Sequence, residues 1–187
     1  MNSNEIKSFP NSESNESLVS ISLKNNNDKE IRAKELLEGI LKKYSLGKWI
    51  YTHEVLLEAG ARPHAFPVIT LGTYKDKEFM LRMFIHEQLH WIEKGKEDSM
   101  KRAIEDLKLL FPNAPTGRPE GADSEESTYR HLVICRLEFL AAKDLIGEDK
   151  ARESVLGDKE YTWIHGAVLD NGSQIDLIIE KYFPNIL

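Results

Sequence analysis

The segment EFMLRMFIHEQLHWIEK, residues 78–94, contains neither proline nor glycine, and its apolar side chains recur at helical spacing. The positions that form this apolar stripe are Leu81, Ile85, Leu89 and Ile92. We therefore predict a helix with one buried face. It should end near Gly95, because glycine readily adopts the left-handed conformation that closes many helices. The rest of the chain must then supply the surface that covers this face.

The same segment places His86 and His90 four residues apart, with Glu87 directly after the first histidine. Positions i and i+4 lie on one face of a helix, so both imidazoles can reach a single ion. Neutral imidazole is a ligand of Zn²⁺, and a catalytic zinc site keeps one coordination position for water. Zinc lowers the pKa of that water to about 7, and the adjacent Glu87 carboxylate can act as general base. The pattern therefore supplies two ligands and a base, and it needs a third ligand from elsewhere.

Two other interpretations of this helix stay open. In one, the protein binds a metal or a partner through the helix without catalysing a reaction. In the other, it binds no metal, and the motif is a core helix with two hydrogen-bonded histidines. Random order would produce the motif in roughly two of a hundred chains of this composition, which favours a metal site.

A later segment, HLVICRLEFLAAKDLIG at residues 131–147, contains two candidates for the third ligand. It is apolar nearly all round, which predicts a buried helix with Glu138 in its middle. A buried charge is costly unless it is paired, and metal coordination is one way to retain it, so Glu138 is our first choice. An ion pair with a cation is the alternative role for Glu138. If His131 is the ligand instead, the site has three imidazoles, and Glu138 can orient one of them.

A hydrolytic site also needs a group that stabilises an oxyanion, usually His, Tyr or Arg. We predict a strand for YTWIHGAVL, residues 161–169, and alternation along that strand would place Tyr161 and His165 on one side. His165 is therefore the predicted catalytic residue beside Glu87. Tyr129 and His131 are alternatives for the same role.

The remaining segments predict a domain of mixed α and β structure. Strands are expected at 18–23 and twice within 48–74, and helices at 28–44, 99–111, 124–146, 149–155 and from Ser173 onward. A surface loop rich in proline and glycine, residues 112–127, is expected to border the site. The strand before the motif helix should border it too, where an exposed strand edge could pair with an extended peptide substrate. The expected fold class is α+β, with a small sheet packed against the motif helix and a second buried helix.

The composition is that of one globular domain. A net charge of −6 over 187 residues argues against nucleic acid as a partner. Residues 1–17 are rich in Asn, Ser and Glu, so we predict a disordered tail followed by a single domain at 18–187. No apolar run suits a membrane span or a signal peptide, so we expect a cytoplasmic protein. The single cysteine, Cys135, lies in an apolar run and is expected to be a buried thiol.

The residues HEQLH, with a glutamate 48 positions after His90, resemble the zincin metallopeptidases and, among them, the thermolysin-like branch. This resemblance implies a zincin-like α+β fold and zinc held by His86, His90 and Glu138. It further implies that Glu87 activates zinc-bound water to cleave peptide bonds in a peptide or protein substrate. The resemblance covers these motifs only. The branch that adds a glycine and a third histidine directly after the motif is excluded, because WIEKGK follows His90.

Overall fold

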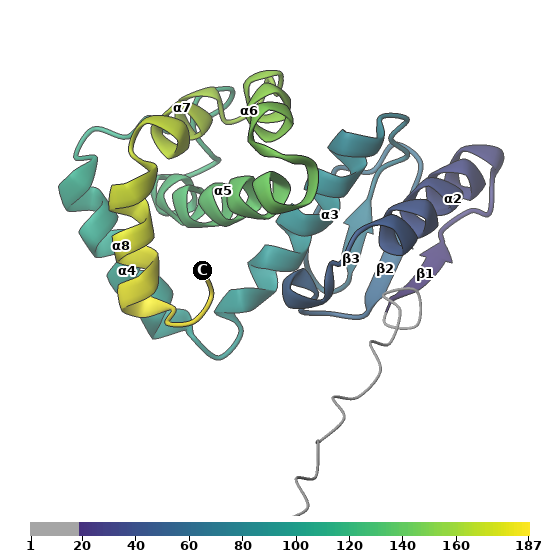
Figure 1. The fold of residues 1–187 in the computed structure, drawn as a ribbon, viewed down its shortest axis with the longest axis horizontal. Coiled ribbons are helices and arrows are strands. Elements are labelled where there is room, and N and C mark those ends of the chain that lie inside the picture. The colour runs from purple at the N-terminus through teal and green to yellow at the C-terminus, as the bar shows by residue number, and fades with distance from the viewer. Residues whose placement is uncertain (1–18) are drawn as a thin grey trace, which may run out of the picture.

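The computed structural model describes residues 19–187, and the predicted disordered tail at 1–17 lies outside them. Within the described residues a small sheet and a group of helices lie on opposite sides of one helix, α3 (Figure 1). The strands are β1 (Ser20–Leu23), β2 (Glu54–Leu57) and β3 (Ile69–Leu71). The helices are α2 (Asp28–Lys43), α3 (Lys77–Leu89), α4 (Glu97–Leu110), α5 (Glu125–Ile146), α6 (Glu148–Leu156), α7 (Thr162–Asp170) and α8 (Gly172–Tyr182). The mixed α and β class is confirmed.

The three strands are parallel and lie in the order β1, β2, β3. Parallel neighbours need a crossover connection, and α2 supplies it between β1 and β2. Both α2 and α3 pack against the strands, which explains why every residue of β3 is buried. This sheet supports the first turns of α3, where the motif helix begins.

The outer edge of β3 is not open to a substrate. The Thr70 amide donates to the His64 carbonyl at 2.8 Å, and the His64 amide donates to the Thr70 carbonyl at 3.1 Å. The segment before β3 therefore folds back and pairs with the edge that faces away from β2. The hypothesis that this edge binds an extended peptide is wrong, because its backbone groups at Thr70 are already paired.

Residues 162–170 form a helix, α7, so the predicted strand at 161–169 is wrong. The buried residues follow helical spacing: Ile164, His165, Ala167 and Val168. The amides of Thr162 and Trp163 donate to the carbonyls of Pro119 and Glu120, which satisfies two groups at the start of the helix. Packing against α5 then decides the conformation, since the β-propensity of aromatic and branched residues is a weak preference.

Helix α5 is the second buried helix that the sequence predicts. It is 22 residues long, and the Ser124 hydroxyl caps it by accepting from the Ser127 amide at 3.1 Å. The helices packed against it are α3, α4, α6, α7 and α8. Between residues 19 and 187, no helix combines the length and the apolar character that crossing a bilayer requires. The core position of α5 places both Glu138 and His131 against the motif helix.

The buried Glu30 carboxylate ties the start of α2 to the loop after β2. It accepts hydrogen bonds from the amides of Asn25 at 2.8 Å and Ala59 at 3.0 Å. Burial opposes ionisation of this carboxyl, but the hydrogen bonds from Ala59 and Asn25 outweigh it and lower the pKa of Glu30 to about 2. The ionised form therefore stabilises the folded protein.

We expect Glu30→Gln to unfold at a lower temperature than the native protein at pH 6. Because the pKa of Glu30 is lower in the folded state, its stabilising effect is complete above pH 4.5 and disappears as the pH falls toward 2. The difference between the two melting temperatures should shrink over this range. Thermal unfolding of both proteins at pH 6, 4.5 and 3 measures it, and a difference that stays constant with pH would contradict this role.

Candidate metal centre

The structure brings the two motif imidazoles together, as the helical spacing predicts. His86 lies in the last turn of α3, and His90 begins a short 3₁₀ helix, η2 (His90–Glu93), that continues from it. Their Nε2 atoms are 3.3 Å apart. The change to 3₁₀ geometry therefore leaves the two rings on one side of the backbone, with the same nitrogen of each ring directed to a common point.

His131 of α5 supplies a third imidazole. Its ring centroid lies 5.5 Å from that of His86 and 5.1 Å from that of His90. One ring nitrogen from each of the three histidines belongs to a group of atoms that all lie within 4.8 Å of one another. The Nδ1 atom of His131 donates to the Ser127 carbonyl at 2.7 Å, since a carbonyl only accepts, so its Nε2 carries the lone pair that could bind a metal.

Two of the three imidazoles are in the protonation state that a metal requires. Burial and the neighbouring His86 lower the pKa of His131 to about 3, and burial together with His86 holds the pKa of His90 well below its ordinary value. Both rings are therefore neutral at pH 7, and a metal needs no proton to leave them. The donor set of three imidazoles fits zinc.

Glu138 contacts the opposite side of the His86 ring. One carboxylate oxygen accepts from His86 Nδ1 at 2.7 Å, and the other accepts from Arg82 Nε at 2.6 Å. Burial opposes ionisation of Glu138, but Arg82 and His86 hold its pKa well below its usual range. Since both oxygens are engaged away from the His90 ring, the geometry favours His131 over Glu138 as the third ligand. Glu138 then fixes which nitrogen of His86 faces the ion.

A second group of ligand-type atoms shares His86. It consists of His86, Cys135 and Glu138, all of them buried. The Arg82 guanidinium touches this group through Glu138, and it would repel a divalent cation placed there. Burial also raises the pKa of the Cys135 thiol, which opposes formation of the thiolate that binds metals. The predicted buried thiol of Cys135 is confirmed. Of the two groups of ligand-type atoms, the three imidazoles are therefore the better metal site.

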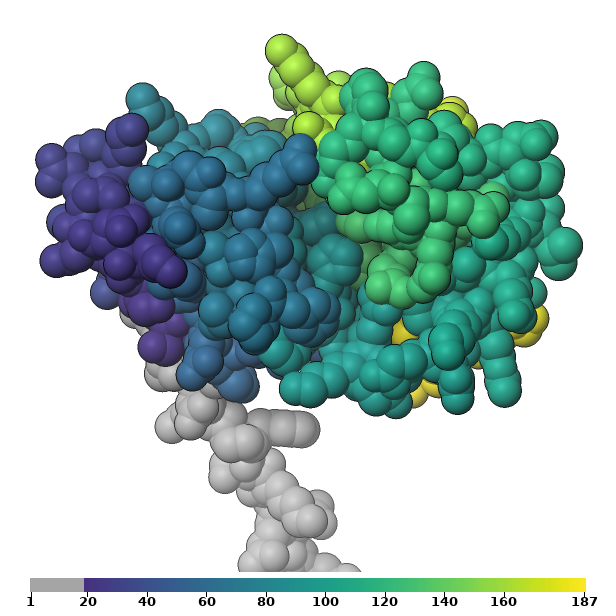
Figure 2. Space-filling model, turned by 180° about the vertical axis from the view of Figure 1, so that it is seen from behind, coloured from purple at the N-terminus to yellow at the C-terminus, as the bar shows by residue number. Residues whose placement is uncertain are grey.

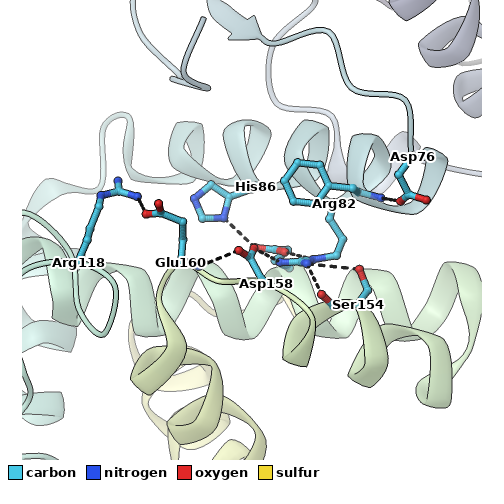
Figure 3. A network of polar contacts seen from close by, with 9 residues as sticks. Asp76, Arg82, His86, Arg118, Ser154, Asp158 and Glu160 are labelled. Atoms are coloured by element: carbon cyan, nitrogen blue, oxygen red, sulfur yellow. Dashed lines mark hydrogen bonds and ion pairs between the residues drawn. The ribbon is translucent and has the colours of Figure 1, made fainter. Parts of the chain in front are cut away.

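Arg82 is a site residue that the sequence interpretation missed. It lies four residues before His86 on α3 and is fully buried. Besides Glu138 it contacts the end of α6 and the segment that follows: it donates to the Ser154 carbonyl at 2.6 Å and pairs with Asp158 at 3.2 Å (Figure 3). An arginine within an apolar helix indicates a buried ion pair, and this signal was present in the sequence.

Arg82→Lys is expected to lower the free energy of unfolding by about 1–3 kcal/mol. Lysine keeps the positive charge near Glu138, but it cannot also reach the Ser154 carbonyl and Asp158, so these acceptors lose their donors. Urea unfolding measures the change. The matched control is Arg102→Lys on the exposed side of α4, which should change stability by less than about 0.5 kcal/mol. Equal stability of the two variants would show that the Arg82 contacts contribute nothing.

A cleft of about 330 Å³ opens beside His86 and Glu87. One wall is the loop after β2, residues 60–63, and the other contains Arg118 and Tyr161. Figure 2 shows the surface hollowed between the blue and the green segments that carry these walls. The loop at 112–127 thus borders the site, as predicted, and it contributes Arg118, which the sequence alone did not single out.

The Glu87 carboxylate faces this cleft from α3. Its side chain is buried and has no hydrogen-bond partner within residues 19–187, and burial raises its pKa. A carboxylate with free acceptor atoms that lines the same cleft as His86 can receive a proton from a water molecule there. The position of Glu87 therefore agrees with the role of general base.

Tyr161 is the polar group that lies closest to the three imidazoles from the opposite wall. Its hydroxyl is 3.2 Å from His131 Nε2 and accepts from Arg118 at 3.1 Å. Tyr161 lies directly before α7, and its backbone has φ 57°, a left-handed conformation that is strained for this residue type. Arg118 in turn pairs with Glu160 (Figure 3).

The predicted catalytic residue His165 also lines the cleft, but from a helix. It is buried, its Nδ1 has no hydrogen-bond partner within the described chain, and its ring centroid is 6.3 Å from that of Tyr161. Tyr129 is away from the site, because its hydroxyl donates to the Phe111 carbonyl at 2.6 Å. Tyr161 is therefore better placed than His165 or Tyr129 to contact a substrate oxygen.

Comparison of the chain with protein-family models, with curated proteins and with solved structures gave no match. The likeness to zincins therefore depends on the motif residues alone.

Proposed function

We propose that this protein is a zinc-dependent hydrolase of zincin-like architecture that cleaves peptide bonds. One observation carries the proposal: three imidazoles from two helices come together, and one of them, His86, lines an open cleft with Glu87, a carboxylate without hydrogen-bond partners in the described part of the chain. A structural zinc site is closed by four protein ligands, whereas three ligands and a cleft leave a position for substrate.

In this proposal His86, His90 and His131 hold the zinc, and Glu138 orients His86. The arrangement departs from the thermolysin-like ligand set, since Glu138 supports a ligand and does not replace His131. When bound, zinc acts as a Lewis acid, which makes water a nucleophile near neutral pH and polarises a carbonyl group.

The residues of the cleft carry out the proton transfers. Glu87 takes a proton from the attacking water while the water oxygen bonds to the carbonyl carbon. The Tyr161 hydroxyl, oriented by Arg118, donates a hydrogen bond to the oxygen that becomes negatively charged. Glu87 then delivers its proton to the leaving nitrogen as the carbon–nitrogen bond breaks. Each step uses a group that lines the cleft.

A polypeptide substrate suits the walls of the cleft. Phe79 and Met83 lie on α3, two turns and one turn before Glu87, and give an apolar surface, while Arg62 adds a polar group to the lining. The cleft also opens to the molecular surface (Figure 2), so an extended chain can enter from solvent.

Metal analysis and peptide digestion test the proposal together. Untagged protein supplemented with zinc should retain one equivalent after gel filtration, and it should cleave members of a mixed peptide library, detected by mass spectrometry, until a chelator is added. Less than about a tenth of an equivalent would favour the interpretation without metal. Full zinc occupancy without cleavage would favour a metal-binding protein that is not an enzyme.

A further inference from the structure

A second hollow, of about 520 Å³, lies between α2 and the segment that leads into α3. We name it the basic groove. Its lining residues are Lys29, Arg32 and Leu36 of α2 and Thr73, Tyr74 and Lys75 of the connecting segment. It is thus formed by two parts of the chain that are far apart in sequence.

The charge of the basic groove is opposite to that of the whole chain. Lys29, Arg32 and Lys75 are exposed, and none of them forms an ion pair with another residue of the 19–187 region. No acidic side chain lines the hollow, although the chain carries a net charge of −6. Three unpaired cations around one concave surface create a local positive potential that attracts a negatively charged ligand.

The basic groove adjoins the cleft of the candidate metal centre. Tyr74 lines both hollows, so the two are separated by no more than this side chain. Helix α3 begins at Lys77, and His86 lies nine residues further along it, which is about 14 Å along the helix axis. An extended polypeptide covers that distance with about four residues.

We propose that the basic groove binds an acidic segment of the polypeptide substrate, about four to six residues from the bond that is cleaved. The role in substrate selection rests on the proposed function, whereas the binding of an acidic peptide does not. A polypeptide fits better than a nucleic acid, because single-stranded nucleic acids need a longer track of cations and several stacking aromatic rings, and this groove offers only Tyr74.

Fluorescence anisotropy with a labelled hexaglutamate peptide tests the binding. The native protein should bind this probe at low ionic strength, more weakly as salt is added. The triple variant K29E/R32E/K75E should bind it at least about tenfold more weakly, because three attractive contacts become repulsive. All three positions are exposed, and circular dichroism checks that the variant is folded.

A matched control separates the groove from the overall charge. The triple variant K96E/K101E/R102E has the same net charge, and its exposed positions lie at or near the start of α4, at the opposite end of the molecule from α2 (Figure 1). It should bind the probe within about twofold of the native protein. Equal losses in both variants would overturn the proposal. So would tighter binding of a labelled RNA hexamer that K29E/R32E/K75E abolishes, because the groove would then be a nucleic-acid site.

Kinetics test the link to catalysis separately. For a cleaved peptide that carries an acidic cluster, K29E/R32E/K75E should raise KM about tenfold and leave kcat unchanged. For a neutral peptide neither constant should change. Unchanged KM for the acidic peptide would contradict the role in selection. If no peptide is cleaved by the native protein, the proposed function fails, while the anisotropy result still decides whether the groove binds acidic peptides.

Discussion

Glu87→Gln is expected to lower peptide hydrolysis by about 100- to 10,000-fold while zinc stays bound. Glutamine has the size and shape of glutamate but cannot accept a proton at neutral pH. Because Glu87 makes no hydrogen bond within the described residues, its replacement leaves no partner without a contact. The loss of activity should therefore occur without loss of stability, which separates a catalytic role from a structural one.

A second glutamate on the same stretch provides the control. Glu93 lies in η2, and its carboxylate contacts Arg130 at 3.4 Å, outside the cleft. Glu93→Gln should therefore keep activity close to that of the native protein. Turnover is followed by mass spectrometry on the same peptide for all three proteins, and zinc content is measured in parallel. Native-like turnover of Glu87→Gln would rule out general-base catalysis by this residue.

His131→Ala is expected to weaken zinc binding by more than about 100-fold, and Glu138→Gln by about 10- to 100-fold. The first change removes a ligand nitrogen from the group of three imidazoles. The second keeps all three nitrogens but weakens the hydrogen bond that orients His86. The order of the two effects therefore distinguishes the geometry of the structure from the ligand set that the thermolysin-like resemblance implies.

Competition with a coloured zinc chelator measures both affinities. The chain offers a control of the same type as His131→Ala: His53 lies on the segment before β2 and is not a member of the group of three imidazoles, so His53→Ala removes an imidazole from outside that group. Its zinc affinity should equal that of the native protein. If Glu138→Gln lost more affinity than His131→Ala, then Glu138 and not His131 would be the third ligand.

Much of the site could be predicted from local patterns in the sequence. Uninterrupted apolar spacing predicted the motif helix, and this helix with the short η2 that continues it sets the relative position of His86, Glu87 and His90. The apolar run around Glu138 predicted the buried helix α5. Both inferences depend on side chains within a few residues of one another, which is the range over which helical periodicity acts.

The remaining features depend on contacts between distant segments. A buried Glu138 predicted either a ligand or an ion pair, and only the fold shows that Arg82, 56 positions earlier, takes one of its oxygens. Helix α7 was mistaken for a strand, because the packing of α5 overrides the preferences of its aromatic and branched residues. The pairing of Thr70 with His64 likewise arises from a loop that folds back, and no local pattern in the sequence predicted it.

The two candidate ligands lie on one helix, and this explains why the sequence alone could not decide between them. Glu138 is two turns beyond His131 on α5, so the helix that packs against α3 brings both toward His86. One contacts Nδ1 of that ring, and the other stacks near its face. In the proposed centre, the resemblance to zincins concerns the motif helix, while α5 would provide a different donor.

X-ray absorption spectroscopy of the zinc-loaded protein tests the central claim most directly. If His86, His90 and His131 hold the ion, the spectrum will show only nitrogen and oxygen neighbours at about 2.0–2.1 Å, with the multiple-scattering features of about three imidazoles, and His131→Ala will remove one of them. A sulfur neighbour at about 2.3 Å would place the ion at Cys135. That result, or an imidazole number unchanged in His131→Ala, would contradict the proposed centre.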